Sequence, residues 1–242
     1  MEAKNILAVD TSSRVLSVAI SAGDQAVFEA NLDGTPRHSE QLIDLIEEGL
    51  KRLKLKKNQL DELAWGLGPG SFTGLRVGLT TAKIFAYVCP MKLVGVSSLE
   101  AIAWEAPDFK GEVAVILDAK KEKLYSGIFY VRNKMLKMIR KPELVKIEML
   151  LKNVKTPRLF LGDGVKMFQE KILNTKFCQI ADGTESVYPM ASNIARQALT
   201  LVQHKKFADP FTIEPLYLHP RDCNVTTRLT YLPAGRQARA RR

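Results

Sequence analysis

A glycine-rich segment in the first third of the chain has the residues of an anion-binding turn. Gly66, Gly68, Pro69 and Gly70 interrupt an apolar run, and Ser71 follows them as the candidate N-cap of a helix. A glycine turn between a strand and a helix N-terminus can bind a phosphate through its backbone N–H groups. The segment lacks the lysine of a P-loop, which favours a turn required by the fold over a phosphate site.

Two aspartates are the candidate acidic groups of a nucleotide site. Asp10 and Asp118 each end an apolar strand, at corresponding places in the two halves of the chain. Such aspartates can hold a metal–nucleotide complex, but a strand-terminal aspartate also caps the following turn, and we favour this second interpretation. The candidate phosphate or nucleotide residues combine these carboxylates with nearby hydroxyls and glycines: Asp10, Thr11, Ser12, Gly68, Gly70, Asp118, Gly162 and Asp163.

The histidines and cysteines do not predict a catalytic or metal-binding centre. His38, His204 and His219 are far apart, and the three cysteines share no metal-ligand spacing. Ser71 and His38 have no third residue to orient them as a nucleophile and its base. We therefore expect no catalytic residue and no metal ligand. The odd cysteine number, the lack of a signal peptide and the lack of ~18 consecutive apolar residues predict a cytoplasmic protein without a membrane partner.

The elements that must position these residues follow the same order in both halves of the chain. Three short strands come first, followed by a helix, a strand, a second helix, a further strand and a last helix. In the first half these elements are expected at residues 6–10, 15–20, 26–32, 38–53, 63–67, 71–88, 93–96 and 98–107. In the second half they are expected at residues 113–118, 124–131, 135–139, 142–151, 158–161, 165–173, 177–180 and 190–204.

This duplicated order is typical of the actin-like ATPase (ASKHA) architecture, in which two early hairpins face each other across a cleft and handle phosphates. The sequence thus predicts an α/β protein with two similar domains. We place the N-terminal domain at residues 1–106 and the C-terminal domain at residues 107–227. Residues 228–242 have little to bury and are expected to form a disordered basic tail.

The charge of the chain fits a polyanionic partner but does not require one. The formal net charge is +10, of which five arginines in residues 228–242 supply half. Two clusters, residues 51–57 and Lys120, Lys121 and Lys123, are candidates for salt-sensitive contacts with nucleic-acid phosphates. Solvated surface is the competing interpretation of both clusters.

One face of the second predicted helix carries a small residue at every fourth position, namely Gly74, Gly78 and Ala82. Such a flat face lets another helix approach closely, and the first predicted helix has an apolar stripe. We hypothesise that both helices dock on a partner. Arg76, a charged group among apolar neighbours, is expected to find a carboxylate. The candidate interface residues are His38, Leu42, Ile46, Leu50, Leu53, Gly74, Arg76, Gly78 and Ala82.

Seven segments keep the order and spacing of one known family. They are ILAVDTS (6–12), RHSEQL (37–42), GPGSFTGLRVG (68–78), GVSSL (95–99), LDAKK (117–121), GDG (162–164) and PLYL (215–218). On these segments the chain resembles the TsaB family, also called YeaZ, and the long GPGSFTGLR string is the most specific of them. Lys120 and Lys121 stand where the family usually has arginines, and His219 stands where it more often has arginine.

The resemblance implies a structural subunit that is not an enzyme by itself. The implied complex adds the threonylcarbamoyl group to N6 of the tRNA adenosine next to the anticodon. The implied partners are the catalytic subunit TsaD, which carries a metal-binding His-x-x-x-His pair that this chain lacks, the ATPase TsaE, tRNA through the complex, and a second copy when TsaD is absent. ATP or ADP at a complex interface is the candidate cofactor. The alternatives are a stand-alone kinase or ATPase using Asp10 and Asp118, and a glycoprotease-like peptidase.

Overall fold

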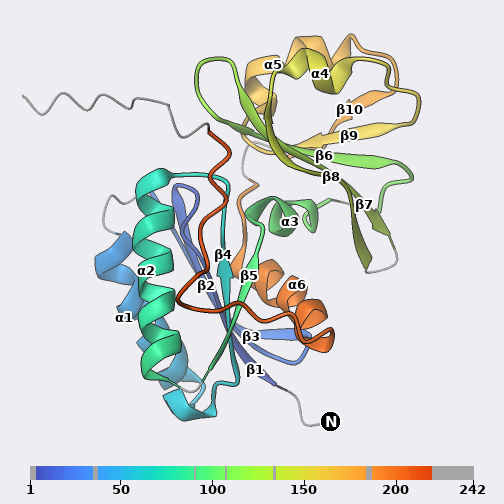
Figure 1. The fold of residues 1–242 in the computed structure, drawn as a ribbon. Helices are drawn as coiled ribbons and strands as arrows, with labels where there is room; N and C mark the ends of the chain where they lie inside the picture. Colours follow the sequence, from blue (N-terminus) through green and yellow to red (C-terminus); the bar gives the residue numbers. More distant parts are fainter. Residues whose placement is uncertain are drawn as a thin grey trace, which may run out of the picture.

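The computed structural model describes residues 4–34, 38–89, 91–106, 108–132, 135–183 and 187–219. These residues form two lobes, each built on a five-stranded sheet (Figure 1). The strand order is β3-β2-β1-β4-β5 in the first sheet and β10-β9-β6-β7-β8 in the second. The second sheet thus repeats the first, with β6, β7 and β8 in the places of β1, β2 and β3. The predicted fold class is confirmed.

The first lobe is a three-layer sandwich. Its sheet consists of β1 (Asn5–Asp10), β2 (Val15–Ala22), β3 (Gln25–Asp33), β4 (Glu62–Gly66) and β5 (Lys92–Val96). Helices α1 (His38–Arg52) and α2 (Phe72–Val88) cover one face. A short helix η1 (Lys57–Gln59), which the sequence did not predict, follows α1 and buries none of its residues. Strands β1 and β4 are apolar and buried on both faces, as covered parallel strands are.

The second lobe has the same plan with shorter helices. Its sheet consists of β6 (Glu112–Asp118), β7 (Leu124–Arg132), β8 (Met135–Val145), β9 (Arg158–Leu161) and β10 (Cys178–Ile180). Helices α4 (Ile147–Leu151) and α5 (Val165–Leu173) pack on one face. On the other face lies α3 (Ser98–Ala103), which follows β5 directly.

Two local predictions are wrong. The helix expected at residues 142–151 is confined to residues 147–151, because β8 continues through Pro142 and pairs with β7 as far as Val145. The second error concerns α3, expected at residues 98–107, which ends at Ala103 and has Ser97 as its N-cap residue. Ser98 is the first residue of the helix, and its hydroxyl binds elsewhere in the first lobe.

The chain returns to the first lobe after completing the second sheet. Helix α6 (Ala191–Gln203) packs on the face of the first sheet that α1 and α2 leave uncovered (Figure 1). Residues 207–219, called the strap here, then pass the edge of the sheet, where the Ala208 N–H donates to the Leu93 carbonyl at 2.8 Å. On the far side Ile213 joins the core beneath α1 and α2. The predicted boundary at residue 106 stays a prediction, and the predicted tail lies outside the described residues.

No helix among the described residues is both long and apolar enough to cross a lipid bilayer.

Candidate functional site

In the first lobe the candidate nucleotide residues form a closed hydrogen-bonded cluster. The Asp10 carboxylate is fully buried and accepts from the Ser12 N–H and Ser12 Oγ at 2.7 Å and from Ser98 Oγ at 2.5 Å. Burial raises the pKa of Asp10 to about 6, against the lowering effect of these hydrogen bonds. The bond from Ser12 N is the turn-capping contact expected of a strand-terminal aspartate.

The glycine turn is bound to the same cluster. The Gly68 N–H donates to Ser98 Oγ at 3.0 Å, and the Ser71 N–H donates to the Ser12 carbonyl at 2.6 Å. A Cβ added at Gly70 would lie 2.1 Å from that carbonyl. These two N–H groups already donate to acceptors within the chain. A phosphate could bind them only by breaking those hydrogen bonds. The geometry favours a turn required by close packing, and phosphate binding at Gly68 and Gly70 stays a prediction.

The second lobe places its aspartates in a more open arrangement. Asp163 accepts from the Asp118 N–H at 2.9 Å, and Asp118 accepts from the Lys120 N–H at 2.7 Å and the Lys120 ammonium at 2.6 Å. Burial raises the pKa of Asp118, but hydrogen bonds and charge from Lys120 outweigh it and hold that pKa below its usual range. Burial raises the pKa of Asp163. Gly162, at φ +103°, lets the backbone turn against the Ile116 carbonyl.

The small-residue face of α2 points into the fold, and the prediction that it docks on a partner is wrong. A Cβ added at Gly78 would lie 2.1 Å from Thr11 Oγ1, and one at Gly74 would lie 2.2 Å from the Thr11 carbonyl. Thr11 Oγ1 donates to the Gly74 carbonyl at 2.9 Å. Ala82 is fully buried in the core. The flat face therefore accommodates the loop after β1.

The apolar stripe of α1 is also internal. Leu42, Ile46 and Leu50 are buried in the core between α1 and the first sheet, and Leu53 packs on it. They form the core of this chain and offer no free interface, which corrects their assignment to a docking surface. The side chain of His38 lies outside the described residues.

The opposite, outward face of α2 exposes large apolar groups that the sequence analysis did not single out. Its apolar members are Phe72, Ile84, Tyr87 and Val88, and the strap adds Phe211 and Tyr217 beside them. We call these six residues and Arg76 the α2–strap face. Tyr87 is 77% exposed and Ile84 57%.

Among the described residues, Arg76 contacts aromatic groups from both parts of this face and not the expected carboxylate. Its guanidinium lies 3.9 Å from the Phe72 ring centroid, and its Nε donates to the Tyr217 hydroxyl at 3.2 Å. The rings of Phe72 and Tyr217 are 5.5 Å apart, and those of Tyr87 and Phe211 are 6.3 Å apart. An exposed surface of aromatic rings, aliphatic side chains and one arginine has the composition of a protein–protein interface.

Comparison with known proteins assigns the chain to a family. Residues 34–211 match a family model described as "TsaD: tRNA N6-adenosine threonylcarbamoyltransferase". The chain is 29% identical to the Bacillus subtilis tRNA threonylcarbamoyladenosine biosynthesis protein TsaB over 217 residues, covering 88% of this chain and 93% of that protein. The Escherichia coli TsaB is 31% identical over 123 residues, 50% of this chain and 52% of its own length. The chain belongs to the TsaB (YeaZ) family.

A solved TsaB-family structure shares the fold. YeaZ from Pseudomonas aeruginosa superposes with a TM-score of 0.76 at 21% identity, covering 89% of this chain and all of that one. The sequence matches to the TsaB relatives confirm the resemblance inferred from the seven segments. The glycine string that carries it, residues 68–78, is the segment that packs against the loop after β1.

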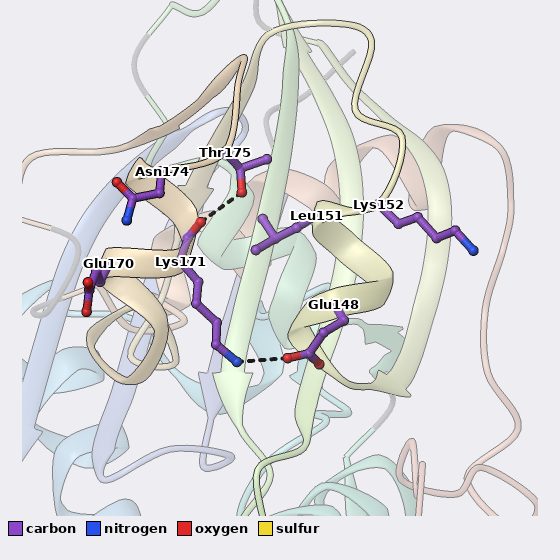
Figure 2. Close-up of a pocket in the computed structure, with 7 residues that line it drawn as sticks. All are labelled: Glu148, Leu151, Lys152, Glu170, Lys171, Asn174 and Thr175. Atoms are coloured by element: carbon purple, nitrogen blue, oxygen red, sulfur yellow. Dashed lines mark hydrogen bonds and ion pairs between the residues drawn. The ribbon is translucent and has the colours of Figure 1, made fainter.

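One open hollow among the described residues of this TsaB-family chain is lined by none of the candidate residues. Figure 2 shows it between α4 and α5, lined by Glu148, Leu151, Lys152, Glu170, Lys171, Asn174 and Thr175. Across this hollow, Lys171 Nζ forms an ion pair with Glu148 Oε1 at 2.8 Å. It contains no candidate site residue, and no group of three or more His, Cys, Asp or Glu among the described residues is arranged to hold a metal.

The buried Asp10 should make the stability of this TsaB-family protein depend on pH. Its pKa is about 6 in the folded chain and 3.8 as the reference value, so between these pH values the folded state holds more protons. We expect its contribution to the free energy of unfolding to fall by about 2.4 kcal/mol as pH rises from 4 to 7. Urea denaturation of the wild type and of Asp10→Asn measures this contribution as the difference between the two proteins. A difference that stays constant with pH would contradict it.

Proposed function

We propose that this chain is the structural subunit of the assembly that adds the threonylcarbamoyl group to N6 of the tRNA adenosine next to the anticodon. The observation that carries the proposal is the match to the TsaD-type family model together with relatives named tRNA threonylcarbamoyladenosine biosynthesis protein TsaB. In this assembly the chain binds and stabilises TsaD, and TsaE joins them. Because its substrate is tRNA, we propose that this assembly acts in the cytoplasm.

The closed cluster of the first lobe supports a role without chemistry of its own. Nucleotide chemistry on this fold needs groups that can turn toward phosphates, but the Asp10 oxygens and the turn N–H groups are bonded to Ser12 and Ser98. The stand-alone kinase or ATPase would require this buried cluster to open. The peptidase alternative would require a nucleophile with an oriented base, whereas the Ser71 Oγ serves as a helix cap and accepts from the Gly74 N–H.

The α2–strap face is the surface that we propose for TsaD. Its aromatic rings and Arg76 are presented by a rigid, 17-residue helix whose inner side is fixed in the core. Aromatic and arginine side chains dominate binding energy in protein interfaces. The same surface can join two copies of this chain when TsaD is absent, so the two complexes compete.

ATP turnover distinguishes the structural subunit from the stand-alone enzyme. The purified chain should hydrolyse no more ATP than a buffer blank, and ATP or ADP should act only at an interface with TsaD and TsaE. Turnover is measured by phosphate release from the chain alone and from the chain with both partners. Hydrolysis by the isolated chain that Asp10→Asn and Asp118→Asn both abolish would establish the kinase-like alternative instead.

A further inference from the structure

The β7–β8 hairpin presents an uncovered basic surface on the second lobe. Its two strands extend away from α4 and α5, which cover the rest of that sheet face (Figure 1). We propose that the outer face of this hairpin contacts the sugar-phosphate backbone of tRNA. This inference rests on the proposed function, because it names the surface by which the subunit would contact the substrate of the assembly.

The alternation of side chains defines the face. Val131, Leu136 and Met138 point inward and pack with α3 in the core of the second lobe. The residues between them are exposed and form what we call the hairpin face: Tyr130, Arg132, Met135, Lys137 and Ile139. Tyr130 lies directly across from Lys137 in the strand register, and Arg132 lies across from Met135. Lys137 therefore lies beside an aromatic side chain and Arg132 beside an apolar one, on neighbouring strands of the sheet.

The hairpin has the charge of a polyanion-binding surface. The described residues 128–132 and 135–141 contain four cationic side chains, Arg132, Lys137, Arg140 and Lys141, and no carboxylate. Arg140 forms an ion pair with Glu143, a later residue of β8, whereas Arg132, Lys137 and Lys141 form no ion pair with a described residue. An exposed tyrosine among cations also offers a surface on which a base can stack.

The basic clusters selected from the sequence also hold cations that form no ion pair with a described residue, three in residues 51–57 and two in the second cluster, but other cations of both clusters are bound to carboxylates. Within residues 51–57, Arg52 pairs with Glu48 and Lys57 pairs with Glu47. In the second cluster the Lys120 ammonium is bound to Asp118. Phosphate binding by these paired cations would break existing ion pairs, whereas Arg132 and Lys137 lie on a face with no acidic residue.

Protection of a sheet edge does not account for the whole hairpin face. Lysines on an edge strand such as β8 discourage pairing with another chain. Tyr130 and Arg132, however, belong to β7, which is paired on both sides. The hairpin also lies on the other lobe from α2, so one chain can bind TsaD and nucleic acid together (Figure 1).

Charge reversal on the hairpin tests the proposal. The full-length Arg132→Glu/Lys137→Glu variant and the wild type are each mixed with TsaD, and binding of fluorescently labelled, unmodified tRNA is measured at several salt concentrations. We expect the affinity to fall roughly tenfold or more, and the slope of log K against log salt to become shallower by roughly 1.5. The matched control, Lys152→Glu/Lys155→Glu, changes the net charge equally at exposed positions of the same lobe and should bind like the wild type.

The outcomes separate this inference from the proposed function. Sedimentation of each variant with TsaD, without tRNA, reports subunit docking and should be unchanged. Equal tRNA affinity in the wild type and the hairpin variant, or an equal loss in the control, would overturn the inference. A hairpin variant that changes the oligomeric state would also overturn it, since β8 would then be a protein contact. Failure of the wild type to bind TsaD would instead contradict the proposed function.

Discussion

Replacing Gly78 with alanine should destabilise the folded chain by roughly 1–3 kcal/mol, although alanine is the better helix former. The new methyl group would lie 2.1 Å from Thr11 Oγ1 and 3.0 Å from Trp65 Nε1, and Trp65 is fully buried. Thr11 would have to rotate and lose its bond to the Gly74 carbonyl, which is worth about 1 kcal/mol. Urea denaturation of the purified variant measures the loss.

A second substitution shows whether the steric cause is correct. Thr11→Ala removes the oxygen that Gly78→Ala would meet, so the double variant should lose less stability than the sum of the single variants. Thr80→Ala, at an exposed position of the same helix, should change stability by about 0.5 kcal/mol or less. If Gly78→Ala kept wild-type stability but lost TsaD binding, the small-residue face would be the docking surface after all.

The Ile84→Asp/Tyr87→Asp variant should fold normally and lose its affinity for TsaD by roughly 100-fold or more. Both side chains are mostly exposed, so their replacement removes little buried area from the chain itself. In the complex each new carboxylate would be buried without a partner, which is strongly unfavourable. Sedimentation velocity of mixtures with TsaD measures the affinity, and urea denaturation confirms the fold.

The matched control for that experiment lies on the second lobe. Met149 and Leu173 are each 56% exposed, on α4 and α5, and are not part of the α2–strap face. The Met149→Asp/Leu173→Asp variant should bind TsaD like the wild type. Equal losses in both double variants would indicate a general effect of surface charge and would remove the assignment to α2 and the strap.

The duplicated fold could be predicted from the sequence because its signals are local. Apolar strands ending in Asp10 and Asp118 open both halves, and glycine turns follow the fourth strand of each. The extent of β8 could not be predicted, because Pro142 indicates the start of a helix or a break in a strand. Only pairing with β7, which extends to Val145, shows that the strand continues.

The candidate site was harder to predict because it depends on contacts that are distant in the sequence. Spacing alone shows that Gly74, Gly78 and Ala82 form a flat face, but not that Thr11 fills it. The partner of Arg76, Tyr217, is 141 residues away. One signal was present: α2 also has Phe72, Ile84 and Tyr87 away from its buried stripe, and a helix that is apolar on both faces indicates a second partner.

The most direct test of the account is reconstituted threonylcarbamoylation of tRNA, followed as modified adenosine formed over time. With TsaE, ATP and the threonylcarbamoyl donor present, product should form with TsaD and this chain together, and not with this chain alone. The Ile84→Asp/Tyr87→Asp variant should fail to support the reaction, whereas Met149→Asp/Leu173→Asp should support it fully. Product formed by this chain without TsaD, or full activity of the α2 variant, would contradict the account.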